Sequence, residues 1–211
     1  MTTALYPAAL LLELTRVVRA TPWLLEVLHV IATDAPPKSY AAAGVIRNTV
    51  WDVLHGRHGA EPTGDIDVVY YDPACQRVTL EQRLKRRLPQ YRWEVTNQAT
   101  VHLWQSAKLG SPVEPYPSLA AALRSWPETA TCVAVALGEN GGLEVVAPFG
   151  LTDLFSMIVR PSPELRDPNA YRCRSRDKDW QTRWPRLTVL PLDAPLHSSS
   201  AGAIAGPRGP G

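Results

Sequence analysis

Residues 63–72 read Thr-Gly-Asp-Ile-Asp-Val-Val-Tyr-Tyr-Asp, and a turn signal there precedes a run of β-branched and aromatic residues. This pattern predicts a β-strand. Alternate side chains of a strand share a face, so Asp65 and Asp67 lie on one face and Ile66 and Val68 on the other. Two carboxylates roughly 6–7 Å apart repel each other unless a cation lies between them. Because hard cations prefer carboxylate oxygens, the stretch predicts a divalent metal site.

The composition narrows the class of protein. The chain has 211 residues, 45% of them hydrophobic and 20% charged, which is ordinary for a soluble globular protein with a buried core. A net charge of +2 is too small to predict nucleic-acid binding by itself. Three cysteines without a C-x-x-C pair argue against a disulfide framework or a zinc knuckle. With no apolar run of membrane-spanning length and no signal-peptide pattern, we expect a cytoplasmic protein without a membrane partner.

The domain organisation follows from apolar spacing and composition. Residues 1–38 are predicted to form a helical layer that belongs to the same domain as the residues after it. Apolar residues at helical spacing between Ala8 and Ala32 predict two helices, with Thr21-Pro22 as the N-cap and first turn of the second. Residues 39–190 are expected to form the main domain, and the Ser-, Gly- and Pro-rich residues 191–211 a disordered tail.

A helix start precedes the aspartates. Helical spacing begins near Gly44, and Gly56 is a natural stop. A glycine at the helix start would let a phosphate approach exposed N–H groups and the positive end of the helix dipole. Arg47, one turn later, could place a bidentate fork on the same phosphate. The alternative interpretation is a glycine that eases a strand-to-helix turn and an arginine on a solvated face.

A third carboxylate comes from the next strand. Residues 91–98 are predicted to form a strand, and an amphipathic helix over residues 80–88 separates it from the aspartate strand. A helix between two strands favours a parallel crossover, which could bring Glu94 beside Asp65 and Asp67. The alternative is a solvent-exposed glutamate on an edge strand.

The remaining segments alternate between predicted helices and strands. We expect a helix over 118–126, strands over 131–137 and 143–147 joined by a Gly-rich hairpin turn, and a short helix from 152 to 159. Residues 171–184 are basic and aromatic, which predicts either contact with a nucleotide or nucleic acid, or a surface helix anchored by its tryptophans. Loops between residues 101 and 117 and the segment after Pro161 are expected to select the acceptor of any transferred group.

The order of these motifs resembles the core of polymerase-beta-type nucleotidyltransferases. Gly44-x-x-Arg47-Asn48 followed by Asp65-x-Asp67 is similar to the head motif of CCA-adding enzymes and poly(A) polymerases, in which Gly-Gly-x-Val-Arg-Asp precedes an Asp-x-Asp strand. The block from Ala43 to about Trp184 more closely resembles a family of small bacterial proteins described as predicted nucleotidyltransferases. Its further motifs are Trp93-Glu94-Val95-x-Asn97-Gln98-Ala99, Trp126-Pro127-Glu128-Thr129-Ala130-Thr131, Ala147-Pro148-Phe149-Gly150-Leu151-x-Asp153-Leu154-Phe155 and Val159-Arg160-Pro161.

The resemblance implies a fold and a reaction. The fold is α/β, a minimal nucleotidyltransferase fold in which helices flank a mixed β-sheet. Asp65, Asp67 and Glu94 would hold two divalent metal ions, Mg²⁺ or Mn²⁺. The reaction would transfer a nucleoside monophosphate from a nucleoside triphosphate to a hydroxyl group on a small molecule, a protein or RNA.

The resemblance also implies a donor site with two departures from the related enzymes. Gly44, Arg47 and Asn48 would bind the nucleoside triphosphate. Ala43 stands where the related motif has its first glycine, and Asn48 where it has aspartate, so CCA addition itself is not expected. The weakened glycine pair motivates an alternative hypothesis, a non-catalytic nucleotide-binding or interaction module on the same fold.

Overall fold

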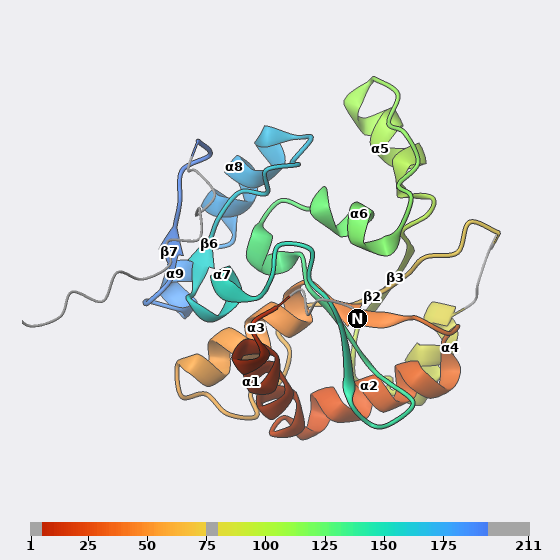
Figure 1. Ribbon diagram of the computed structural model, residues 1–211, viewed down its shortest axis with the longest axis vertical. Coiled ribbons are helices and arrows are strands. Elements are labelled where there is room, and N and C mark those ends of the chain that lie inside the picture. The colour runs from red at the N-terminus through yellow and green to blue at the C-terminus, as the bar shows by residue number, and fades with distance from the viewer. Residues whose placement is uncertain (1–5, 75–79, 194–211) are drawn as a thin grey trace, which may run out of the picture.

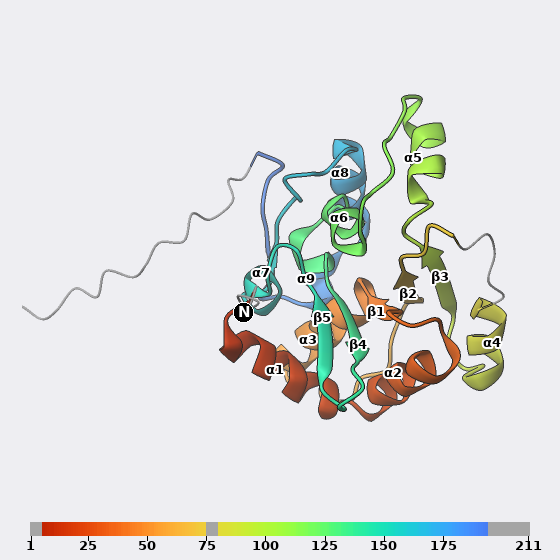
Figure 2. The same ribbon diagram turned by 45° about the vertical axis from the view of Figure 1, so that its right-hand side comes forward.

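The computed structural model describes residues 6–74 and 80–193. Its centre is a five-stranded mixed sheet with the order β3-β2-β1-β4-β5 (Figure 1; Figure 2 labels all five strands), the α/β architecture expected. β2 and β3 run parallel, as the helix between them predicted, and all other neighbours run antiparallel. The strands are β1 (Tyr40–Ala42), β2 (Ile66–Tyr70), β3 (Trp93–Asn97), β4 (Ala134–Leu137) and β5 (Leu143–Val146). Most of the predicted tail, from residue 194 on, lies outside the described residues, as does Cys75.

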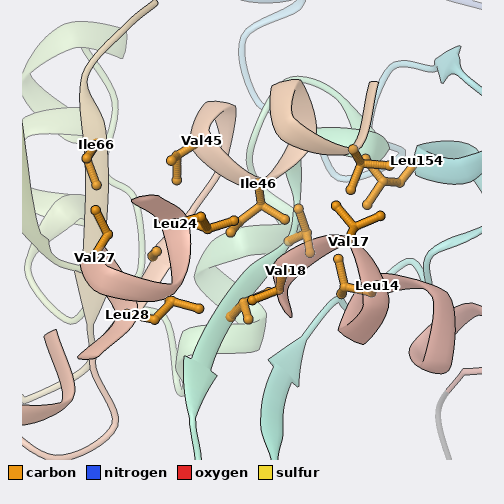
Figure 3. Close-up of a cluster of buried hydrophobic side chains, with 14 of the residues drawn as sticks. Leu14, Val17, Val18, Leu24, Val27, Leu28, Val45, Ile46, Ile66 and Leu154 are labelled. Atoms are coloured by element: carbon orange, nitrogen blue, oxygen red, sulfur yellow. The ribbon is translucent and has the colours of Figure 1, made fainter. Parts of the chain in front are cut away.

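One face of the sheet packs on the main hydrophobic core. Figures 1 and 2 show α1 (Ala8–Arg19), α2 (Pro22–Asp34) and α4 (Leu80–Arg87) gathered on one side of the molecule. In Figure 3, Val27 of α2 lies close to Ile66 of β2, Leu24 of α2 lies beside Ile46, and Val17 of α1 lies near Leu154. The two N-terminal helices therefore share a core with the strand that carries the aspartates.

The opposite face is only partly covered. α6 (Leu119–Arg124) packs Leu119 and Leu123 against apolar side chains of β1 and β4. No such apolar layer covers the polar residues that β2 and β3 present on this face, among them Asp67 and Glu94. The uncovered half of the sheet is where the site lies.

The C-terminal segment folds back against α3 (Gly44–Leu54). It contains α7 (Thr152–Phe155), β6 (Ile158–Val159), α8 (Pro168–Asp177), α9 (Trp180–Arg183) and β7 (Thr188–Val189), and β6 and β7 pair in parallel. The rings of Trp180 and Trp184 are buried edge-on against Trp51, with centroids 6.4 and 5.2 Å away. This confirms the interpretation of residues 171–184 as a segment anchored by its tryptophans.

Three local predictions were wrong. Val101–Leu109, expected to be a loop, forms helix α5. The helix expected over 152–159 ends at Phe155, since Met157 has a φ of 54° and the chain continues as β6. The strand expected from Thr131 starts at Ala134, because Thr129–Thr131 form a 3₁₀ turn.

The break between the first two helices lies where Thr21-Pro22 predicted it, but the cap differs. Thr21 is the N-cap residue of α2, yet its hydroxyl donates back to the Val17 carbonyl at 2.8 Å instead of accepting from the new helix. Pro22, with no N–H, therefore supplies the start signal alone.

Within the two described ranges, no helix combines the length and apolar character that a membrane span requires.

Candidate active site

A cavity of about 690 Å³ opens over the uncovered part of the sheet. Its floor is formed by alternate side chains of the two parallel strands β2 and β3. β2 and the residue before it contribute Asp65, Asp67 and Val69. β3 and the residues on either side of it contribute Arg92, Glu94, Thr96 and Gln98. The start of α3 closes one end. Side chains of α5, of α8, of the loop over residues 60–64 and of residues 125–127 are also part of the lining.

The strand register brings the three predicted carboxylates to this floor. Asp67 and Glu94 are direct neighbours across the parallel pair β2–β3, so they share a face about one strand spacing (roughly 4.8 Å) apart. Asp65 lies two residues earlier and lines the same cavity, just before the strand begins at Ile66. Its carboxylate pairs with Arg92 at 2.8 Å. Among the described residues, no three acidic, His or Cys side chains stand together closely enough to hold a metal ion as they are oriented.

Asp67 carries negative charge that the protein alone does not balance. Burial, followed by repulsion from Glu94 and Asp65, raises the pKa of the Asp67 carboxyl from 3.8 to about 6, against a smaller opposing effect of Arg174 and Arg47. A cation at this position would relieve the repulsion.

The turn that the sequence predicts to receive phosphate is formed by Ala43 and Gly44. The Ala43 N–H donates to the Val133 carbonyl at 3.0 Å, and the next residue starts α3. N–H groups of the first helical turn have no partner inside the helix and point outward with the positive end of its dipole. A Cβ added at Gly44 would meet only Asn48 Nδ2 at 3.8 Å and Arg47 Nη2 at 4.0 Å, which are ordinary contacts. No contact with residues 6–74 or 80–193 therefore requires a glycine at position 44.

Arg47 lies beneath the turn and is not on a solvated face. It is 4% exposed, and its Nη1 donates to Thr131 Oγ1 at 2.6 Å while Nε and Nη2 donate to Asn48 Oδ1 at 3.2 and 2.9 Å. Its guanidinium stacks 5.0 and 5.2 Å from the ring centres of Trp51 and Trp180. Burial lowers the pKa of Arg47 to about 10, so it stays charged at neutral pH. The alternative of a solvated arginine is wrong, and direct phosphate contact stays a prediction.

Comparisons with known proteins agree with this geometry. The family model described as nucleotidyltransferase matches residues 30–189. The chain belongs to this family. No curated protein sequence matches the chain significantly.

Solved structures show the same fold. A nucleotidyltransferase relative solved by NMR, described as revealing a CCA-adding enzyme head domain, is 31% identical. The alignment covers 84% of this chain and 94% of that one, with a TM-score of 0.71. The Thermotoga maritima CCA-adding enzyme complexed with tRNA is 17% identical with a TM-score of 0.50, and the alignment covers 87% of this chain and 42% of the enzyme. The similarity to that enzyme is one of fold. The expected nucleotidyltransferase resemblance and fold are confirmed.

Two buried acids of this nucleotidyltransferase were missed by the sequence reasoning. Glu128 is 1% exposed and accepts from Arg174 Nε and Nη2 at 2.5 and 3.1 Å and from Thr131 Oγ1 at 2.7 Å, with Arg47 Nη1 at 3.8 Å. Arg174, on α8, also lines the cavity. Glu128 had been noted only as part of a family motif, and nothing in the local pattern identifies its partner 46 residues away.

The second missed acid is Asp52 on α3. It accepts from Arg57 Nε and Nη2 at 3.0 and 2.7 Å, from Arg183 Nη2 at 2.7 Å and from Trp184 Nε1 at 2.8 Å. Together, Asp52 and Glu128 bind the basic C-terminal segment through Arg183 and Arg174, next to helix α3, which starts at Gly44.

Ala43→Gly is expected to stabilise this nucleotidyltransferase. Ala43 has φ 56° and ψ −122°, a region that glycine enters freely and that costs other residues of the order of 1–3 kcal/mol. Part of this gain is offset by the greater freedom of glycine in the unfolded chain. We expect a net gain of about 1 kcal/mol, or roughly 2–4 °C in a thermal melt. The control is Ala42→Gly in β1, which should lower the melting temperature; a similar loss at position 43 would show that Ala43 is unstrained.

Asp67→Asn is expected to stabilise the metal-free protein at neutral pH. Since one pKa unit corresponds to about 1.4 kcal/mol, the shift from 3.8 to about 6 sets an upper limit near 3 kcal/mol. The folded-state pKa lies above the unfolded value, so the contribution of Asp67 is fully favourable below about pH 4 and is lost as the pH rises through about 6. The advantage of the variant should therefore grow from about pH 4 to pH 7 in melts recorded with a chelator.

The matched control for this pH dependence is Glu139→Gln, in the exposed turn between β4 and β5. Its melting temperature relative to the unchanged protein should vary little over the same range. An advantage of Asp67→Asn that is equal at acid and neutral pH would show that charge at Asp67 is not its cause.

Proposed function

We propose that this protein is a metal-dependent nucleotidyltransferase that moves a nucleoside monophosphate from a nucleoside triphosphate to a hydroxyl acceptor. The observation that carries the proposal is the in-register pair Asp67–Glu94, with Asp65 on the same face, in one cavity with the start of α3. Three carboxylates would coordinate divalent metal, and the helix start would receive the triphosphate.

The residues present fit a divalent cation in their chemistry. All three offer carboxylate oxygens, which Mg²⁺ and Mn²⁺ prefer, and the raised pKa of Asp67 marks uncompensated negative charge. Metal binding would require the Asp65 carboxylate to exchange its pairing with Arg92 for the ion. When bound, the metal would neutralise charge on the phosphates and on the departing pyrophosphate and would activate the acceptor hydroxyl.

The chain's own groups would orient the donor. The N–H groups at Gly44 and the residues after it would bind phosphate oxygens. Arg174 lines the cavity and acts electrostatically on Asp67, and Lys178, the residue directly after α8, also lines the cavity. Arg47 and Asn48 would hold the helix start from below through the bonds between them. Preorganised positive charge of this kind stabilises a transferring phosphoryl group.

The direct test is incubation of the protein with labelled nucleoside triphosphates, Mg²⁺ or Mn²⁺, and candidate small-molecule, protein and RNA acceptors. We expect metal-dependent release of pyrophosphate and label transfer to one acceptor class. Calorimetric titration with and without Mg²⁺ separates this from a non-catalytic nucleotide-binding module, for which the metal would change affinity little. Failure of every triphosphate to bind with metal present would reject both.

Gly44→Ala is expected to weaken triphosphate binding at least about 10-fold without loss of stability. The added Cβ fits within the protein but occupies the space through which a phosphate would approach the helix start. Alanine is also the better helix former. Calorimetry would measure the affinity for the triphosphate, and a thermal melt on the same sample would measure the stability of the variant. Unchanged triphosphate affinity would place the phosphates elsewhere.

We also propose that residues 1–190 act as one domain, since α1 and α2 share their core with the sheet. Nucleoside triphosphates are abundant in the cytosol, and Cys132 and Cys173 are free thiols, both in keeping with a cytosolic enzyme.

A further inference from the structure

The cavity continues along β3 beyond the carboxylates, toward α5, and this half contains side chains that the proposed reaction leaves without a role. Gln98 lines it with only 4% of its surface exposed, and its carboxamide makes no hydrogen bond within the described part of the chain. Trp104 of α5 lines the same cavity but is 55% exposed, and its ring contacts no other aromatic or cationic group among residues 6–74 and 80–193.

Both side chains are open to a ligand. The Gln98 carboxamide has no protein partner among the described residues and lines the cavity, and the exposed indole of Trp104 leaves a large apolar face in water. A carboxamide offers a donor and an acceptor side by side, which complements the edge of a heteroaromatic ring. An open indole face suits stacking on that ring. Together the two groups match a nucleobase.

The position of this pair relative to the carboxylates fits a nucleotide. Gln98 lies four residues beyond Glu94, roughly 13 Å along the strand direction. That separation is comparable with the length of a nucleotide from its phosphate to the far edge of its base. Lys108 of α5 pairs with Asp167 before α8 at 3.3 Å, which joins the two walls on either side of this compartment. Arg166 lines the same wall and has no carboxylate partner in the described residues.

We propose that Gln98 and Trp104 form a nucleobase compartment, in which Trp104 stacks on the base and Gln98 hydrogen-bonds its edge. The base belongs either to the donor triphosphate or to a nucleotide of the acceptor, because both present the same ring. The compartment rests on the proposed function only for its distance from the reacting phosphate. Its test needs neither metal nor turnover.

The experiment is calorimetric titration of the full chain, without divalent metal, with the 5′-monophosphates of adenosine, guanosine, cytidine and uridine. Ribose 5-phosphate serves as the ligand without a base. At least one nucleotide should bind 10-fold or more tightly than ribose 5-phosphate. Trp104→Ala should lower that affinity about 5- to 150-fold, the range of base stacking, while Trp104→Phe keeps most of it. Gln98→Ala should mainly reduce the preference among bases.

Leu103→Ala is the matched control, since Leu103 is the preceding residue on α5, is 63% exposed and does not line the cavity. The Leu103→Ala variant should bind every one of these ligands with the same affinity as the unchanged protein. The proposal is overturned if nucleotides bind no more tightly than ribose 5-phosphate, or if the Trp104 and Gln98 variants keep full discrimination.

A second pair of titrations identifies the source of the base. If the base is the donor's, Trp104→Ala weakens nucleoside triphosphates but not inorganic tripolyphosphate. If the base is the acceptor's, Trp104→Ala leaves the affinity for nucleoside triphosphates unchanged. The same variant then loses the binding of nucleoside monophosphates that is measured in saturating tripolyphosphate. Both outcomes support the compartment. Base discrimination without any pyrophosphate release would reject the proposed function and keep the compartment. Nucleotidyl transfer without base discrimination would reject the compartment and keep the proposed function.

Discussion

Asp67→Asn should reduce nucleotidyl transfer at least about 1,000-fold while making the metal-free protein more stable. The substitution removes one of the carboxylates proposed to hold metal, and metal-assisted charge neutralisation is worth several kcal/mol in the transition state, with 1.4 kcal/mol equal to a factor of ten in rate. Pyrophosphate release from labelled triphosphate measures the loss of rate. Calorimetry should show that Mg²⁺ no longer strengthens triphosphate binding.

Opposite changes in activity and stability distinguish this effect from unfolding. Substituting a residue that stabilises the fold would lower the stability of the protein, whereas substituting a carboxylate that neighbouring charges repel should raise it. Asp65→Asn and Glu94→Gln should also reduce transfer, and Glu139→Gln should leave it unchanged. Full activity in Asp67→Asn would show that transfer does not depend on the pair Asp67–Glu94 and would remove this pair from the proposed chemistry.

Glu128→Ala should destabilise the protein by about 3–5 kcal/mol, a fall of roughly 6–20 °C in melting temperature. The substitution leaves the buried guanidinium of Arg47 without its anionic neighbour and releases Arg174 from both of its hydrogen bonds to Glu128. Uncompensated buried charge is costly because neither water nor a counter-charge reaches it. Thermal and denaturant unfolding, followed by tryptophan fluorescence, would measure the loss.

The control for this prediction is Glu164→Ala. Glu164 also pairs with an arginine, Arg124, at 3.0 Å, but half of its side chain is exposed to solvent. Exposed pairs contribute about 0–1 kcal/mol, so this variant should melt close to the unchanged protein. Equal losses of melting temperature in the two variants would show that the burial of Glu128 does not increase its contribution to stability.

The placement of the three carboxylates was predictable in part because the relevant rules are local. Alternation in a strand places Asp65 and Asp67 on one face, and the short helical crossover predicts a parallel partner strand that carries Glu94. The exact register, with Asp67 opposite Glu94, comes from the structure. The start of α3 at Gly44 was likewise predictable from helical spacing.

The surroundings of the site could not be predicted in the same way. α5 carries exposed Leu103 and Trp104, so its apolar residues do not mark a single buried face and the helical period is hidden. Glu128 and Asp52 have ordinary local contexts, and their arginine partners are determined only by how distant segments pack. The strained φ of Ala43 is a property of the turn it closes, which a single sequence does not reveal.

The order of synthesis matters for how this fold is completed. Asp52 is made 131 residues before Arg183, and Glu128 is made 46 residues before Arg174, so both buried acids lack these arginine partners until the last helices leave the ribosome. Until then Asp52 has its nearby partner Arg57, and Glu128 has Arg47. Closing such long loops is slow compared with local folding, so the C-terminal wall of the cavity is expected to be completed last.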